Sequence, residues 1–283
     1  MRKSGLFAII VIVFALVVSA CGKKENDNAG NNNAGKDNAA TASAPADTKV
    51  YHFATDASYP PMENMDKDKI VGFDVDFLDA VMKEAGLQYD IKNIGWETLL
   101  TSVQQGTEFD GGISAMSITD KRKETYDFSP AYFESTNMIL VKEDSTIANA
   151  LDLKDKKVAV QTGTTADTLM TGIMGEGSSD LKRFESNALA FMEMNNNGVD
   201  AVVADIAVVQ EYLKSNPKAK YKSIIDRENF ASEYYGIAFP KGSELATKLA
   251  PAVKTVLESD KYKEIYAKWI GGEPDLTGVL NQK

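Results

Sequence analysis

The chain has 283 residues, enough for about two domains of ordinary size. Its 41 Asp and Glu residues outnumber the 31 Lys and Arg residues, and this acidic balance argues against a nucleic-acid partner, which requires a basic face. The single histidine, His52, and the single cysteine, Cys21, exclude an internal disulfide, a CxxC redox pair and a metal site rich in His or Cys, so we expect neither metal nor cofactor.

The N-terminus carries the pattern of an export signal. Two basic residues precede an apolar run from Leu6 to Val18, which is too short to span a membrane comfortably. Ser19 and Ala20 then stand directly before Cys21. This segment resembles a bacterial lipoprotein signal, and the resemblance implies that residues 1–20 are removed and that Cys21 is lipidated, for example with palmitate. The alternative is an uncleaved N-terminal anchor with an incidental cysteine.

The segment that follows the cysteine is polar. Residues 22–47 contain no Val, Ile, Leu or aromatic residue, so they cannot bury a core. We therefore interpret residues 21–47 as a lipid-anchored, disordered tether. It would hold the folded part at the extracytoplasmic face of the cell membrane, in a bacterium with a single membrane.

The first half of the folded part alternates between strand and helix patterns. Apolar and β-prone runs predict strands at 50–55, 87–92 and 110–115. Helical spacing predicts helices at 75–85 and 96–106, with Asp74 as the N-cap of the first and Gly86 as its stop. This order is typical of a mostly parallel sheet covered by helices.

The same alternation starts again further along the chain. The expected strands are 138–142, 157–161, 199–203 and 235–239. The expected helices are 188–194, 206–213, 244–257 and 262–269. The sequence therefore predicts an α/β fold with two similar lobes and a cleft between them, where small molecules commonly bind.

Polar residues follow the first predicted strand, at the edge where open α/β sheets bind ligands. Asp56 and Tyr59 place a carboxylate and an aromatic ring on one loop. The alternative interpretation is an ordinary Asx turn before Pro60-Pro61.

A second candidate loop follows the strand predicted at 110–115. It contains Ser114, Ala115, Ser117 and Arg122, and Thr119 can cap the turn that holds Arg122. A guanidinium group suits a carboxylate, because it donates two parallel hydrogen bonds to it. The alternative is an ordinary surface arginine in a basic run.

The third candidate combines two loops of the second half. The segment from Gln161 to Thr165 opens a helix, whose free N–H groups favour an anion, although the full phosphate-loop pattern is absent. Asp205 ends an apolar strand, so it either caps the next helix or presents its carboxylate to an ammonium group.

Taken together, these segments resemble the polar amino-acid binding proteins of ABC importers, the extracellular solute-binding family 3 with glutamine-, histidine- and arginine-binding members. The resemblance runs in order over residues 50–272. The matching stretches are Ala54–Glu63, Val71–Asp76, Gly95–Trp96, Ser114–Arg122, Tyr126–Pro130, Val158–Thr165, Gly198–Asp205, Tyr235–Pro240 and Tyr262–Gly271.

The resemblance implies a hinged, two-lobed periplasmic-binding-protein fold of type II, in which each lobe is a mostly parallel sheet flanked by helices. Lobe 1 would comprise residues 48–131 and 236–283, and lobe 2 residues 137–230. The two hinges would be residues 132–136 and 231–235.

The resemblance also assigns the two charges of a free amino acid. Arg122, Ser117 and the Thr165 backbone would hold the α-carboxylate, and Asp205 with carbonyls near Ser114–Ala115 would hold the α-ammonium. A zwitterion leaves water at high cost unless both charges are paired. Closure of the cleft would therefore depend on the ligand.

The ligand side chain would lie between Tyr59 and Trp96, with Asp56 at its far end. Gln161 stands where some members place Lys or Leu, and Ala204 where a glutamine binder can place His. A carboxylate without a cationic partner between two rings favours a cationic side chain. We expect arginine or lysine, with glutamine or another polar amino acid, including cystine, as the alternative.

The expected function is that of a monomeric binding protein that delivers its amino acid to the permease subunits of an importer and their ATPase. A dehydratase on the same scaffold is an alternative from another class, but His52, the sole histidine, falls inside the first predicted strand. A sensory or adhesion lipoprotein is a third class. We expect no enzymatic activity.

Overall fold

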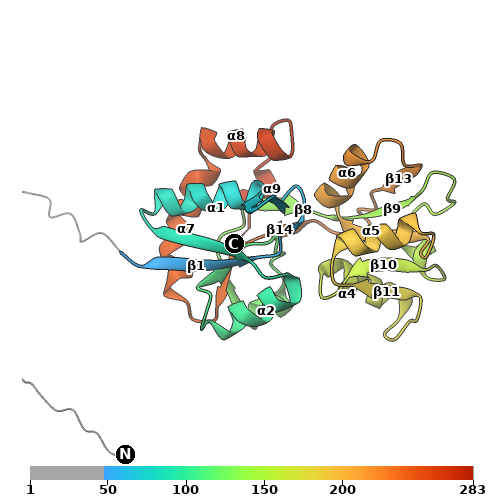
Figure 1. Ribbon diagram of the computed structural model, residues 1–283, viewed down its shortest axis with the longest axis horizontal. Helices are drawn as coiled ribbons and strands as arrows, with labels where there is room; N and C mark the ends of the chain where they lie inside the picture. The colour runs from blue at the N-terminus through green and yellow to red at the C-terminus, as the bar shows by residue number, and fades with distance from the viewer. Residues whose placement is uncertain (1–47, 283) are drawn as a thin grey trace, which may run out of the picture. The chain divides into compact units, whose positions relative to one another are not determined.

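Residues 48–282 are described by the computed structural model, and their first five-stranded sheet has the order β5-β1-β6-β15-β7 (Figure 1). The parallel part joins β1 to β5 and β6, whereas β15 runs antiparallel to both of its neighbours, β6 and β7. A strand from the last quarter of the chain therefore completes a sheet of N-terminal strands. The strand bounds are β1 Val50–Thr55, β5 Gln88–Asn93, β6 Gly111–Gly112, β7 Tyr126–Phe128 and β15 Ala238–Pro240.

The second five-stranded sheet of the described residues has the order β11-β10-β12-β9-β13. Here β10 is parallel to β11 and β12, and β9 is antiparallel to β12 and β13. All five strands come from one continuous stretch of chain. Their bounds are β9 Asn137–Lys142, β10 Val158–Gln161, β11 Leu181–Phe184, β12 Ala201–Asp205 and β13 Tyr221–Ile224.

Helices cover both faces of the second sheet. Successive residues of a strand point to opposite faces, so a single strand contacts helices on each side. In β10, Val158 and Val160 pack in one core cluster with Met170 of α4, whereas Ala159 packs in another with Phe191 of α5. Figure 1 shows the helices of this sheet beside it. Their bounds are η1 Ala150–Leu153, α4 Thr165–Met174, α5 Asn187–Asn195 and α6 Ile206–Ser215.

Three helices pack together on the first sheet around an aromatic core. Phe77 of α1 stacks on Tyr132 with ring centroids 4.7 Å apart, and Tyr262 of α8 meets Phe77 edge to face. These rings are fully or almost fully buried, so they contribute strongly to the stability of this lobe. The helices of this lobe are α1 Phe73–Glu84, α2 Trp96–Gln105, α3 Asp120–Lys123, α7 Glu244–Leu257, α8 Asp260–Trp269 and α9 Thr277–Leu280.

Two small sheets complete the strands of the described residues. The strands β2 (Ser58–Tyr59), β3 (Glu63–Asp66) and β4 (Lys69–Val71) form one of them. The other is a ribbon of β8 (Phe133–Ser135) and β14 (Glu233–Tyr235). Figure 1 shows this ribbon between the two five-stranded sheets with their helices. The molecule is thus a mixed α/β protein with two lobes.

Three local predictions were wrong. Asp74 is not the N-cap of α1, because Gly72 takes that position and the Asp74 carboxylate accepts hydrogen bonds from the Ala115 N–H and the Tyr132 hydroxyl. The strand predicted at 235–239 is divided between β14 and β15, since the chain passes here from the ribbon to the first sheet. The strand predicted at 110–115 is reduced to β6.

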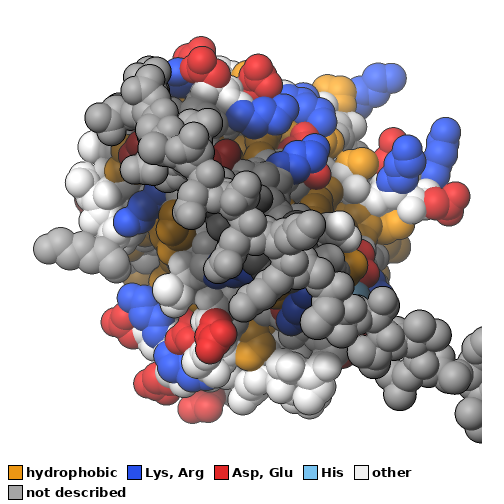
Figure 2. Space-filling view, turned by 90° about the vertical axis from the view of Figure 1, so that its left-hand side faces the viewer, with side chains coloured by type: hydrophobic (Ala, Val, Ile, Leu, Met, Phe, Trp, Pro, Cys, Tyr) orange, Lys and Arg blue, Asp and Glu red, His pale blue; other side chains and the backbone are white. Residues whose placement is uncertain are grey.

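Charged side chains of both signs are interspersed on the face that Figure 2 shows. Ion pairs such as Lys83–Asp79 and Lys268–Asp76, both at 2.6 Å, neutralise part of the surface charge. Exposed pairs of this kind stabilise a fold by less than about 1 kcal/mol each. Within residues 48–282, no helix combines the length and the apolar character that a membrane span requires.

Candidate functional site

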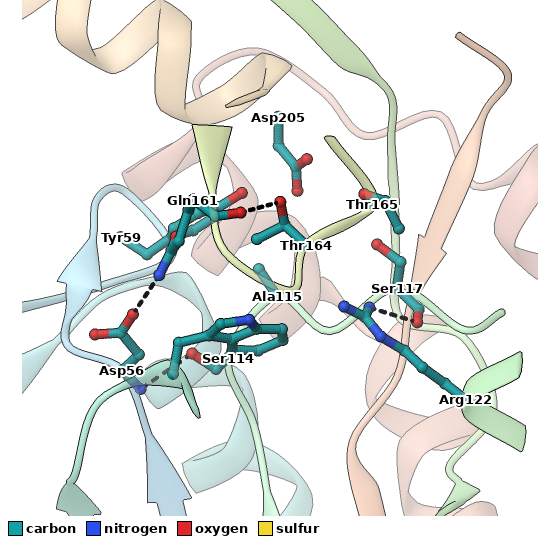
Figure 3. Close-up of a pocket in the computed structure, with 11 residues that line it drawn as sticks. Asp56, Tyr59, Ser114, Ala115, Ser117, Arg122, Gln161, Thr164, Thr165 and Asp205 are labelled. Carbon is teal, nitrogen blue, oxygen red and sulfur yellow. Dashed lines mark hydrogen bonds between the residues drawn. The ribbon is translucent and has the colours of Figure 1, made fainter. Parts of the chain in front are cut away.

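A single pocket is lined by all ten residues that the sequence predicted to bind ligand, and Figure 3 shows it in close-up. Thr164 lines it as well. The space between the lining atoms is about 320 Å³, part of it open to solvent. Cys21, the predicted lipid attachment point, lies outside the described residues. The predicted lining residues are Asp56, Tyr59, Trp96, Ser114, Ala115, Ser117, Arg122, Gln161, Thr165 and Asp205.

The pocket draws on both large sheets, because strand ends from each of them face it. Asp56 follows β1 and Ser114 follows β6 of the first sheet. Gln161 is the last residue of β10, and Asp205 is the last residue of β12 in the second. This placement agrees with the rule that open α/β sheets bind ligands at the carboxyl ends of their strands.

Arg122 lies at one end of the pocket and points its guanidinium group between the two sheets (Figure 3). Its Nη1 donates to the Ser117 carbonyl at 3.0 Å and its Nη2 to the Gly163 carbonyl at 3.2 Å. The Thr119 hydroxyl accepts a hydrogen bond from the Arg122 N–H, so the predicted cap is confirmed. Partial burial lowers the pKa of Arg122, whereas the negative charges of Glu233 and Asp205 raise it.

Arg122 therefore uses two carbonyl oxygens as its nearest acceptors. Among the described residues it makes no ion pair, and its guanidinium carbon lies 5.3 Å from the centre of the Trp96 ring. A partly buried guanidinium held by neutral acceptors can still gain from a carboxylate. This end of the pocket is suited to an anionic group.

Glu233 is a residue of this end that the sequence analysis did not select. Its Oε2 accepts hydrogen bonds from the Ser117 hydroxyl at 2.6 Å and from the Thr165 hydroxyl at 2.8 Å. Its Oε1 accepts from the Asn137 amide. The available signal was weak, since Glu233 is merely a charged residue within the predicted hinge 231–235.

Asp205 faces the pocket, and the pKa of its carboxyl group is raised. The Tyr235 hydroxyl donates a hydrogen bond to it. Burial, and then the charge of Glu233, raises the pKa of Asp205 to about 7, although the Tyr235 and Tyr59 hydroxyls and Arg122 act in the opposite direction. Asp205 takes the N-cap position of α6, but its side chain makes no cap hydrogen bond and its carboxylate faces the pocket instead.

Asp56 lies at the other end of the pocket, as Figure 3 shows, and is already hydrogen-bonded. Its Oδ2 accepts from the Gln161 amide at 3.0 Å and its Oδ1 from the Ser58 hydroxyl at 2.7 Å. The buried Asn187 amide donates in turn to Gln161 Oε1 at 2.9 Å, which turns the Gln161 NH₂ group toward Asp56. Burial raises the pKa of Asp56. Asn187 also escaped the sequence analysis.

Two aromatic side chains border the space between these ends. Tyr59 and Trp96 are both buried, and the indole N–H of Trp96 has no hydrogen-bond partner among residues 48–282. A buried donor without a partner is costly, so this N–H can gain from an acceptor that enters the pocket.

A pair of buried carboxyl groups supports the floor of the pocket. Glu63 Oε1 accepts from the Ser114 hydroxyl at 2.9 Å, and Asp74 Oδ2 accepts from the Ala115 N–H at 2.6 Å. Ala115 has a left-handed φ of 46°. Burial and the neighbouring carboxyl raise the pKa of Glu63 well above its usual range, and burial raises that of Asp74 to about 6. The two neighbouring carboxyl groups thus both bind protons more readily than free ones do.

Comparison with known proteins places the chain in a wider context. Residues 51–272 match the family model described as bacterial extracellular solute-binding proteins, family 3. A probable histidine-binding protein of Neisseria gonorrhoeae is 38% identical over 262 residues, which cover 92% of each chain.

Solved structures are similar as well. The arginine-, lysine-, histidine-binding protein ArtJ of Geobacillus stearothermophilus is 53% identical, with a TM-score of 0.80 over 82% of this chain and 100% of that one. An ancestral arginine-binding protein bound to glutamine is 37% identical, with a TM-score of 0.72 over 79% of this chain and 98% of that one.

Proposed function

The chain belongs to the bacterial extracellular solute-binding proteins of family 3, and we propose that it captures an L-amino acid with a basic side chain in the pocket described above. Relatives at 30% identity or more are named as amino-acid binding proteins, several of them of ABC transporters. The chain accordingly serves an ABC importer, whose permease and ATPase move the amino acid across the membrane.

One observation carries the proposal: Arg122 and Asp205 face the same small pocket from different lobes. A free amino acid needs a partner for its α-carboxylate and another for its α-ammonium group when it leaves water. Arg122 supplies the first and Asp205 the second. Because both partners are in place only when the lobes are together, capture and closure are coupled.

The choice of a basic side chain follows from the charge that remains. Once Arg122 and Asp205 are paired with the two ends of the amino acid, the Asp56 carboxylate is left at the far end of the pocket. An arginine or lysine side chain would pair with it, next to the ring of Tyr59. The binding of arginine, lysine and histidine by the ArtJ relative supports this choice.

Glutamine is the second candidate, and the contact between Gln161 and Asp56 favours it. The Gln161 amide already satisfies one oxygen of Asp56, at 3.0 Å, without a positive charge. A ligand amide could do the same for Asp56. The ancestral relative that was solved with glutamine supports this alternative.

The predicted domain bounds and the anchor belong to the same proposal. The ribbon strands β8 and β14 fall within the predicted hinges 132–136 and 231–235, which supports lobe 1 as 48–131 with 236–283 and lobe 2 as 137–230. We further propose that the protein is a monomer attached to the outer face of the membrane through a lipid on Cys21.

A thermal-shift screen of the purified protein against the twenty L-amino acids tests the proposal. An amino acid present at 100 times its dissociation constant stabilises the fold by about 2.7 kcal/mol, so the true ligand raises the unfolding temperature clearly. Arginine or lysine should give the largest shift. Arg122→Ala should abolish the shift at an unchanged unfolding temperature of the free protein. Stabilisation by none of the twenty would refute the proposal.

A further inference from the structure

The Glu233 carboxylate occupies two hydrogen-bond donors at the Arg122 end of the pocket, the end suited to an anionic group. A hydroxyl group has one hydrogen to donate. The hydroxyl hydrogens of Ser117 and Thr165 are both directed at Glu233 Oε2, at 2.6 and 2.8 Å. While Glu233 keeps this position, neither hydroxyl can donate to a carboxylate of a ligand.

We propose that Glu233 is an internal competitor of the ligand, because its carboxylate occupies two hydroxyl groups beside Arg122 that are otherwise able to donate to an amino-acid carboxylate. In the free protein Glu233 accepts from Ser117 and Thr165, and a bound amino acid takes over these donors next to Arg122. The inference rests on the proposed function, since it assigns the α-carboxylate of the ligand to this end of the pocket.

The position of Glu233 makes this exchange possible. Glu233 lies on β14 of the ribbon, whereas Ser117 belongs to lobe 1 and Thr165 to lobe 2, so one carboxylate contacts both lobes. Its second oxygen, Oε1, is held separately by the Asn137 amide. Glu233 can therefore release both hydroxyls by a small tilt of its side chain about Oε1, which keeps the hydrogen bond to Asn137.

Charge supports the same interpretation. Glu233 is the strongest negative influence on the Arg122 guanidinium, although the two form no ion pair. The Glu233 carboxylate thus supplies negative charge near Arg122, at the end of the pocket where a ligand carboxylate would bind. Two carboxylates beside a single guanidinium repel each other, which favours the departure of Glu233 from the hydroxyls when a ligand carboxylate arrives.

The test compares L-arginine with agmatine, which is arginine without its α-carboxylate, in the wild type and in Glu233→Gln. L-lysine with cadaverine serves as a second pair. Isothermal titration calorimetry gives the dissociation constant of each compound. The loss of one negative charge affects the cationic groups, which both compounds have. The dissociation constant of arginine divided by that of agmatine therefore isolates the effect on the carboxylate.

Glu233→Gln should lower the dissociation constant of arginine relative to that of agmatine by about tenfold or more, because hydrogen bonds to a charged acceptor no longer have to be broken. Glu134→Gln is the matched control. Glu134 lies on the partner strand β8 with its carboxylate beside Gly278, outside the pocket, so the same change of charge should leave the ratio unchanged.

The outcomes are distinct. A ratio that stays unchanged in Glu233→Gln, or rises, while arginine still binds would overturn the inference and leave the proposed function intact. Failure of the amino acids to bind either protein would overturn both. If Glu233→Gln does not fold, Glu233→Asp keeps the charge but shortens its reach, and it should lower the ratio in the same direction by a smaller factor.

Discussion

The Tyr235 hydroxyl donates a hydrogen bond to the Asp205 carboxylate, and this contact joins the ribbon to the second sheet. The hydrogen bond favours the ionised form of Asp205, whereas burial and the charge of Glu233 favour the protonated form. The two effects leave the pKa of Asp205 at about 7. The residue proposed to hold the ligand ammonium group therefore changes its charge near neutral pH.

Ligand affinity should depend on pH through Asp205. Below pH 7 this carboxyl group is protonated in the free protein, and a bound ammonium group lowers its pKa, so binding releases a proton. Affinity should thus rise with pH by up to about tenfold per unit between pH 5 and 7, and level off above pH 7. Calorimetry in buffers with different ionisation enthalpies measures both the affinity and the released proton. An affinity that is flat from pH 5 to 7 would contradict this role.

Tyr235→Phe should move this pH profile. The substitution removes the hydroxyl that lowers the pKa of Asp205, so the midpoint of the rise in affinity should shift to higher pH. The phenyl ring can still stack on Phe133, whose ring centre lies 5.4 Å away, so the fold should persist. Tyr234→Phe is the control, because Tyr234 does not line the pocket. An equal shift in both variants would exclude a specific effect of the Tyr235 hydroxyl.

Asp56→Asn should change the specificity of the pocket. An asparagine can still accept a hydrogen bond from Ser58 but carries no charge, so arginine and lysine should lose about tenfold or more in affinity, and glutamine less. Competition titrations with the three amino acids give the order. A larger loss for glutamine would reverse our preference for a basic ligand. Asp90→Asn, at an exposed carboxylate outside the pocket, should alter none of the affinities.

The carboxyl pair of Glu63 and Asp74 should make the fold less stable as the pH rises. Both pKa values are raised by folding, so the folded protein binds more protons than the unfolded chain above about pH 4. The free energy of unfolding should therefore fall by up to about 1.4 kcal/mol per pH unit for each extra proton, with the contribution of Asp74 lost as the pH passes 6.

Urea unfolding of the free protein from pH 5 to 8 measures this dependence. Glu63→Gln should make it shallower, because the glutamine amide can donate permanently to Asp74. Glu84→Gln, an exposed position at the end of α1, should leave the dependence unchanged. If the dependence were equally steep in Glu63→Gln, the raised pKa values of this carboxyl pair would not be its source.

Gly72→Ala should destabilise the fold severely. A Cβ atom at this position would lie 2.0 Å from the Met62 carbonyl oxygen, and the φ of 148° is unfavourable for alanine. We expect a loss of at least about 3 kcal/mol in the free energy of unfolding, measured by denaturation. Gly86→Ala has space for its methyl group and should cost about 1 kcal/mol through its left-handed φ alone. Similar losses in the two variants would contradict this explanation.

Much of the fold could be predicted because the signals are local. The bounds of α7 and the end of α2 at Gly106 follow from apolar spacing and a left-handed glycine. Asp74 shows the limit of local signals. It stands at a good capping position in the sequence, but tertiary partners, the Ala115 N–H and the Tyr132 hydroxyl, hold its carboxylate instead.

The lining of the pocket could be predicted because its strand ends and loops, taken together, resemble those of one family over residues 50–272, although each loop alone left an ordinary structural alternative open. Glu233 and Asn187 could not, since nothing in their immediate sequence distinguishes them from surface residues. Their importance arises from partners far along the chain: Ser117 for Glu233, and Gln161, through which Asn187 acts on Asp56. Asp205 could be interpreted in two ways until the position of Tyr235 was known.

The place of β15 between β6 and β7 has a consequence for synthesis. A growing chain exposes the edges of β6 (111–112) and β7 (126–128) until residues 238–240 have left the ribosome, and such edges invite aggregation. The second sheet, built from residues 137–224 alone, can form earlier. The middle of the chain is therefore ready to fold first, and its two ends follow together.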